Sequence, residues 1–157
     1  MQHVFWLREG VIAGRTGPNR DVWDPTQLAT GGIGAVLSVN DGELVHTHEL
    51  AEAGISHKCV PFSYEAPPQP GDVETCIAAL PIALRFALSS IQDGKAVLVH
   101  CNSGKDRTGM FLSYYLCITE GLSPVKAIAE VKRVRPIALS AEGWEHLALE
   151  ALNAVGA

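Results

Sequence analysis

A cysteine and an arginine separated by five residues stand near the middle of this chain, in the stretch HCNSGKDR at residues 100–107. An apolar, β-branched run precedes the stretch at 96–99, and a helical pattern follows it from Thr108. On such a turn from strand to helix, backbone N–H groups and the unpaired donors of the helix N-terminus converge on one concavity. Arg107 adds a planar guanidinium that suits two oxygens of a phosphate. The stretch therefore predicts a binding site for a phosphate-like dianion.

The same residues can carry a nucleophilic reaction at phosphorus. The positive field of the loop favours the thiolate of Cys101, which is the form that attacks and that would become a phosphocysteine. Arg107 would stabilise the charge that spreads over the equatorial oxygens, and Thr108 is placed to donate a hydrogen bond to the leaving sulfur. Gly104 is free to adopt a positive φ. The expected phosphate-binding residues are Asn102, Ser103, Gly104, Lys105, Asp106 and Arg107.

This stretch resembles the signature loop of the cysteine-dependent protein tyrosine and dual-specificity phosphatases, His-Cys-x5-Arg followed by Ser or Thr. Its version of the loop, GKDRTG at residues 104–109, is most similar to bacterial and lipid-acting relatives. The resemblance covers nearly the whole chain and implies a phosphatase that acts on phosphorylated proteins or small phosphorylated molecules. It implies no cofactor.

The leaving group needs a proton from a carboxylic acid, and three candidates are open: Asp72 and Glu65 outside the loop, and Asp106 within it. In the resembled family an aspartate on a mobile loop before the long helix has this role, and Asp72 lies 29 residues before Cys101. Asp72 could equally be the N-cap of that helix. Glu65 lies within the proline-rich loop at 61–71. Residues 61–69 resemble the acid loop of phosphoinositide-type relatives, and there the place of the aspartate falls on Tyr64. Asp106 could instead shape the turn through a salt bridge or hydrogen bond.

The histidines are interpreted as structural. Adjacent residues at the end of a strand point to opposite faces, so we expect His100 to orient the loop rather than to act as a base for Cys101. His46, His48 and His57 lack carboxylate or thiol partners at a spacing typical of a metal site, so no metal is expected.

The remaining basic residues are assigned to the surface. Arg15 and Arg20 could contact a substrate, but solvated turn residues are the favoured interpretation. Lys132, Arg133 and Arg135 form the densest basic cluster, which is typical of the C-terminal end of a helix.

Composition sets the protein class. The chain has 157 residues, of which 47% are hydrophobic and 18% charged, and we expect residues 1–157 to form one monomeric domain. Its net charge of −5 argues against nucleic acid as a partner. It contains no run of about 18 apolar residues, so no integral membrane segment is expected. The N-terminus lacks a signal-peptide pattern, and four widely spaced cysteines favour free thiols in the cytoplasm.

Periodicity places the elements around the loop. Strands are expected at 4–7, 10–13, 35–39, 55–60 and 96–99. Helices are expected at 25–30, 47–53, 72–91 with a kink at Pro81, 108–120, 123–134 and 140–152. Alternating strands and helices predict an α/β fold with a mostly parallel central sheet flanked by helices, as in the dual-specificity phosphatases.

Two classes of function fit these observations. The first is an active phosphatase of the protein tyrosine or dual-specificity type, with a phosphoinositide or inositol phosphate phosphatase as its variant because Lys105 makes the loop more basic. The second is a pseudo-phosphatase adaptor that binds phosphate without turnover. A rhodanese-like sulfurtransferase ranks third, because its loop is not expected to place Arg107 and Thr108 in this way.

Overall fold

The computed structural model describes residues 1–64 and 66–155, and within them five strands form one sheet in the order β1-β2-β5-β3-β4. The strands are β1 Phe5–Arg8, β2 Ile12–Arg15, β3 Ile33–Ser38, β4 Ser56–Cys59 and β5 Ala96–His100. Strands β2, β5, β3 and β4 run parallel, and β1 pairs with β2 in the antiparallel direction. The mostly parallel sheet predicted from the sequence is confirmed, with β5 at its centre.

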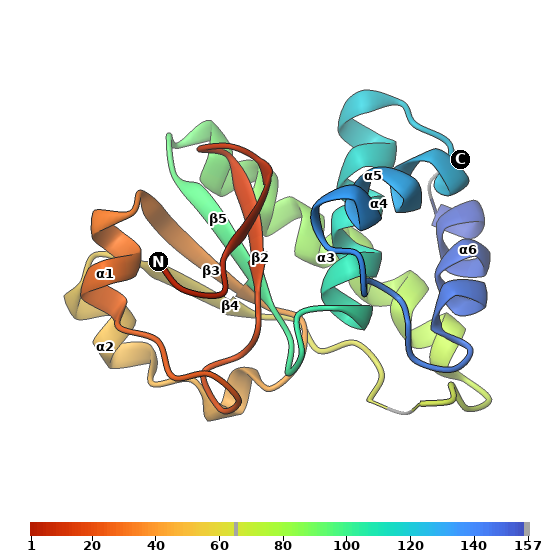
Figure 1. Cartoon of the computed structure of the whole chain (residues 1–157), viewed down its shortest axis with the longest axis horizontal. Helices are drawn as coiled ribbons and strands as arrows, with labels where there is room; N and C mark the ends of the chain where they lie inside the picture. The colour runs from red at the N-terminus through yellow and green to blue at the C-terminus, as the bar shows by residue number, and fades with distance from the viewer. Residues whose placement is uncertain (65, 156–157) are drawn as a thin grey trace.

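Helices cover both faces of the sheet (Figure 1). Successive residues of a strand face opposite sides, so Val36 packs with one apolar cluster and Leu37 with the other. The first cluster includes Leu28 and Leu50 from the short helices α1 and α2, and the second includes Leu112 from the larger helical layer. The helices are α1 Pro25–Thr30, α2 Thr47–Glu52, α3 Asp72–Gln92, α4 Asp106–Glu120, α5 Pro124–Val134 and α6 Trp144–Val155.

Helix α3 is unbroken over its 21 residues and includes Pro81 within the helix. By length and composition alone it could cross a membrane, which is weak evidence because core helices have the same character. Its buried residues, including Leu80 and Ala83, belong to the main apolar cluster, and it packs against α6, α4, β3 and β5. Its apolar character is therefore explained by the core that it fills.

Most element boundaries agree with the sequence pattern to within two residues. Asp24 caps α1, since its Oδ1 accepts from the Thr26 amide at 2.9 Å. Strand β2 lies two residues later than predicted, ending at Arg15. Helix α6 begins at Trp144 instead of residue 140, after a turn whose Gly143 has a φ of +81°.

The parallel strands all end at one edge of the sheet, and the cysteine loop emerges there between β5 and α4. Ligands of open parallel sheets bind in the crevice beyond the carboxyl ends of the strands. The segments that follow β2 and β4 leave from the same edge. The topology therefore surrounds residues 101–105 with segments that are distant in sequence.

Candidate active site

The Cys101 thiol lies at the base of the loop, where the side chain is 1% exposed. The hydroxyl of Thr108, in the first turn of α4, donates a hydrogen bond to the sulfur at 3.1 Å. The first N–H groups of α4 lack partners within the helix, and its dipole adds positive potential at this end. The sulfur is thus held at a helix N-terminus beside a hydroxyl donor.

The carbonyls of Cys101 and Asn102 accept hydrogen bonds from groups outside residues 101–105. The oxygen of Cys101 lies 3.1 Å from Nδ1 of His100. The oxygen of Asn102 accepts from the amide of Gly17, in the segment after β2, at 2.9 Å.

The next three carbonyls are held from the opposite side. Arg135, which caps the C-terminus of α5, donates from Nη2 to the oxygen of Ser103 at 2.7 Å and from Nε to that of Gly104 at 3.2 Å. The oxygen of Lys105 accepts from the amide of Leu139 at 3.1 Å. Burial lowers the pKa of Arg135, and the nearby charge of Cys101 partly offsets this effect.

Five consecutive carbonyls, those of residues 101–105, are therefore bonded to atoms outside the loop. In a trans peptide the carbonyl and the N–H point in opposite directions. Pinning the carbonyls outward turns the amides of the loop toward its interior, where they can bind an anion. The inward-facing amides of residues 102–106 form an anion cradle, and the donors that orient them are brought to the loop by the fold.

Gly104 shows how tightly the loop is packed. Its φ is +62°, as expected from the sequence, in the region that favours glycine. A Cβ at this position would lie 2.6 Å from the carbonyl carbon and oxygen of Arg15 and 2.8 Å from the nitrogen of Thr16. The loop therefore approaches the end of β2 too closely for any side chain at Gly104.

Arg107 lies in the first turn of α4 and is 9% exposed. Its Nε donates to the carbonyl oxygen of Ser63, in the segment that follows β4. Its guanidinium carbon lies 4.8 Å from the ring centroid of Trp144, a cation–π distance. These contacts hold the guanidinium in one place and tie it to the proline-rich segment.

The three candidate acids differ in their surroundings. Asp72 is the first residue of α3 rather than its N-cap, which is Gly71, and Asp72 Oδ2 accepts from the amide of Gln69 at 2.6 Å. Both oxygens of the Asp106 carboxylate are engaged, with Lys105 Nζ at 2.9 Å and the amide of Ala141 at 3.2 Å. Glu65 lies outside the described residues.

Most of the chain matches a known protein family. The sequence model of the "Swiss Army Knife protein, DSP-PTPase phosphatase domain" family matches residues 1–151. The chain belongs to this family. The fold prediction and the resemblance drawn from the signature loop are therefore confirmed.

Individual relatives of this DSP-PTPase domain are named as dual-specificity and tyrosine phosphatases. The chain is 28% identical over 145 residues to dual specificity protein phosphatase 12 of Rattus norvegicus, covering 91% of this chain and 39% of that protein. It is 30% identical over 126 residues to tyrosine-protein phosphatase cdcA of Emericella nidulans, covering 76% of this chain and 19% of that protein. The chain thus spans less than half the length of the curated relatives it matches.

Solved structures share the fold. Tk-PTP in the active form has a TM-score of 0.75 at 23% identity, covering 99% of this chain and 97% of that one. PTPMT1 in complex with PI(5)P has a TM-score of 0.74 at 16% identity, with 98% and 97% covered. Human DUSP28 has a TM-score of 0.72 at 20% identity, with 100% and 97% covered.

Two arginines of this DSP-PTPase domain differ from the sequence-based expectation. Arg15 is not a solvated turn residue: it ends β2, is 2% exposed and donates to the carbonyls of Thr16 and Asp21 at 2.9 and 2.8 Å. Arg135 is not simply a charged helix end, because it holds the loop. The local pattern does not indicate that Arg135 reaches the loop while Arg133 stays exposed and pairs with Glu130.

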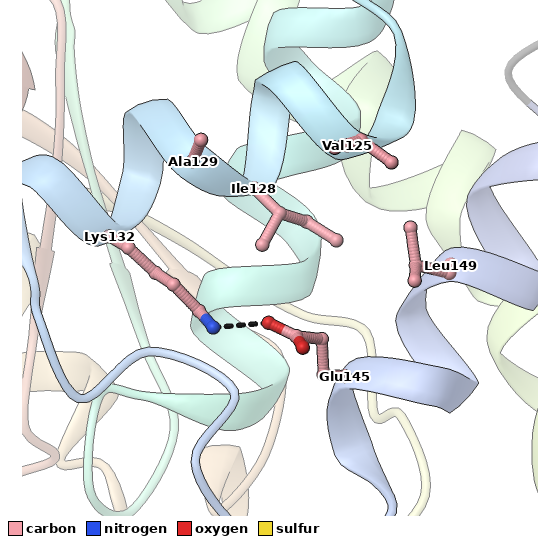
Figure 2. A pocket seen from close by; sticks show the side chains of 6 residues that line it. All are labelled: Val125, Ile128, Ala129, Lys132, Glu145 and Leu149. Atoms are coloured by element: carbon pink, nitrogen blue, oxygen red, sulfur yellow. Dashed lines mark hydrogen bonds and ion pairs between the residues drawn. The ribbon is translucent and has the colours of Figure 1, made fainter.

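Other clusters lie apart from the loop. A hollow of about 260 Å³ between α5 and α6 is lined mainly by apolar side chains and spanned by the Lys132–Glu145 ion pair (Figure 2). None of residues 100–108 lines it. Among the residues that the structure describes, no three His, Cys, Asp or Glu side chains gather as metal ligands.

Proposed function

We propose that this domain hydrolyses phosphomonoesters through a phosphocysteine intermediate, as a phosphatase of the protein tyrosine or dual-specificity type. The observation that carries the proposal is the contact between Thr108 Oγ1 and Cys101 Sγ at 3.1 Å, at the base of a loop whose carbonyls are all bonded outward. Membership of the DSP-PTPase family supports it.

The reaction would proceed in two displacements. The Cys101 thiolate attacks phosphorus, so an S–P bond forms as the P–O bond to the leaving group breaks. Inward amides and the fork of Arg107 bind the equatorial oxygens and stabilise their charge in the transition state. Water then attacks the phosphocysteine, and the Thr108 hydroxyl stabilises the sulfur as it leaves.

The general acid is assigned to Asp72. It begins α3 directly after the proline-rich segment, whose Ser63 carbonyl is bonded to Arg107. Asp106 is less suited, because both carboxylate oxygens are occupied within the turn. Glu65, in the same segment as Ser63, is the alternative to be tested beside Asp72.

Protein substrates are favoured over inositol phosphates. The inositol alternative was based on the charge of Lys105, which would raise the positive potential of the loop. The Lys105 ammonium instead pairs with Asp106 at 2.9 Å and donates to Ser140 Oγ at 3.2 Å. Its charge is therefore largely neutralised within the protein. The free state of all four cysteines supports a cytoplasmic location as part of this proposal.

The substitution Cys101→Ser tests the proposal. Serine is a poor nucleophile in a site that favours a thiolate and offers no base, so turnover of para-nitrophenyl phosphate should be lost while vanadate binding by calorimetry persists. Cys59→Ser, at an exposed free cysteine, is the matched control and should leave turnover unchanged. Hydrolysis by Cys101→Ser within tenfold of wild type would overturn the covalent mechanism. Wild-type protein that binds vanadate but turns nothing over would establish the adaptor instead.

A further inference from the structure

A chain of hydrogen bonds runs across three neighbouring strands and ends on the loop. His57 on β4 lies with Nε2 2.7 Å from the hydroxyl of Ser38, the last residue of β3. The same hydroxyl lies 2.6 Å from Nε2 of His100, the last residue of β5. His100 Nδ1 in turn lies 3.1 Å from the carbonyl oxygen of Cys101.

At neutral pH the carbonyl acceptor and the lowered pKa of His100 together set the proton arrangement at the inner end of the chain. A carbonyl oxygen can only accept, so Nδ1 of His100 must carry a proton that it donates to Cys101. Burial lowers the pKa of His100 from 6.5 to about 4, so the ring is neutral near pH 7 and has no second proton. Nε2 of His100 is therefore an acceptor, and the Ser38 hydroxyl must donate to it.

The outer end follows from the inner one. A serine hydroxyl has one proton, and Ser38 has used it on His100. The oxygen of Ser38 can then only accept from the second imidazole, so Nε2 of His57 must be protonated. Every bond in the chain points the same way, from His57 through Ser38 and His100 to the carbonyl of Cys101.

We propose that His57 is a positioning residue of the catalytic loop, because from a half-buried place on the edge strand β4 it donates the outermost hydrogen bond of this chain and so holds Ser38 and His100 in place. The carbonyl of Cys101 belongs to the same peptide group as the N–H of Asn102. Polarising that carbonyl makes the Asn102 amide a stronger donor inside the anion cradle. The effect on catalysis rests on the proposed function, whereas the direction of the chain does not.

Nitrogen-15 NMR of the imidazoles at pH 7 tests the chain directly. His100 should carry its proton on Nδ1 alone, and His57 should carry one on Nε2. His57→Leu should shift the His100 Nδ1 proton resonance, and the control substitution His48→Leu, at an exposed histidine of α2, should not. A bare Nε2 on His57, or a doubly protonated His100, would overturn the proposal.

Reactivity gives a second readout. His57→Leu should lower kcat for para-nitrophenyl phosphate. It should also slow the alkylation of Cys101 by iodoacetamide, which is monitored by peptide mass mapping. The expected factor is about fivefold, the net worth of one hydrogen bond. His57→Gln retains an N–H donor and should restore both rates, and in a Ser38→Ala background His57→Leu should have no further effect.

The outcomes separate the two proposals. If wild-type protein shows no turnover, but the imidazole protons lie as expected and His57→Leu slows the alkylation of Cys101, the proposed function fails and the hydrogen-bond chain is confirmed. If turnover is normal and His57→Leu changes neither rate in a protein whose melting curve is unaltered, the positioning role is wrong.

Discussion

Arg135 gives the strongest test of how the loop is built. Its guanidinium donates to the carbonyls of Ser103 and Gly104 at 2.7 and 3.2 Å, and Arg135→Met removes both bonds. A hydrogen bond from a charged donor is worth about 1.5–3 kcal/mol, and water can reach part of this half-buried site. We therefore expect a net loss of about 1.5–3 kcal/mol of transition-state stabilisation, or about tenfold to hundredfold in kcat/KM. Arg135→Lys should recover only part of this, because one ammonium cannot copy the fork that spans two carbonyls.

The assay is hydrolysis of para-nitrophenyl phosphate, with vanadate affinity and a melting curve for each variant. Arg133→Met is the matched control: it removes the same side chain two residues earlier, at a position that is 65% exposed and paired with Glu130. It should change kcat/KM less than twofold. Equal activity of Arg135→Met and Arg133→Met, with both proteins folded, would refute the view that outward-held carbonyls create the anion cradle.

Substitutions at Arg107 and Asp72 and the titration of His100 provide three further tests. Arg107→Lys keeps the charge but loses one of two parallel contacts to phosphate oxygens, so kcat should fall roughly a hundredfold; near-normal efficiency would show that Arg107 is not the phosphate ligand. Asp72→Asn should slow the hydrolysis of phenyl phosphate far more than that of para-nitrophenyl phosphate, and Glu65→Gln is compared beside it. The melting temperature should not change, because asparagine still accepts from the Gln69 amide. An equal loss of rate on both substrates would exclude Asp72 as the acid. Burial lowers the pKa of His100 to about 4, so between that value and 6.5 the unfolded chain binds more protons, and the free energy of unfolding should fall by about 3 kcal/mol as the pH drops across this window. Urea titrations that show no such loss in wild type would contradict this assignment.

The sequence identified the reacting groups because they lie in one short segment. Strand, turn and helix start follow each other directly at 96–108, so backbone geometry alone brings Cys101, Thr108 and the helix N-terminus together. The positive φ of Gly104 and the cap of α1 by Asp24 were predictable for the same reason, since each depends on its immediate neighbours. Such features are encoded within a few residues, where steric rules apply regardless of the rest of the fold.

The tertiary structure decided what surrounds that segment. Gly17, Arg135 and Leu139 hold the loop carbonyls although they lie at least 30 residues away in the chain, and Arg15 is buried because the segment after β2 folds over it. The local pattern does not indicate that Arg135 rather than Arg133, or His57 rather than His48, is connected to the loop. These roles depend on which strands become neighbours and where each helix ends, which only the packing of the whole chain determines. The sequence therefore specified the nucleophile and its loop. The fold decided which distant donors bond the loop carbonyls and so turn the amides inward, because a buried carbonyl needs a hydrogen-bond donor and only the packed chain determines which donor lies within reach.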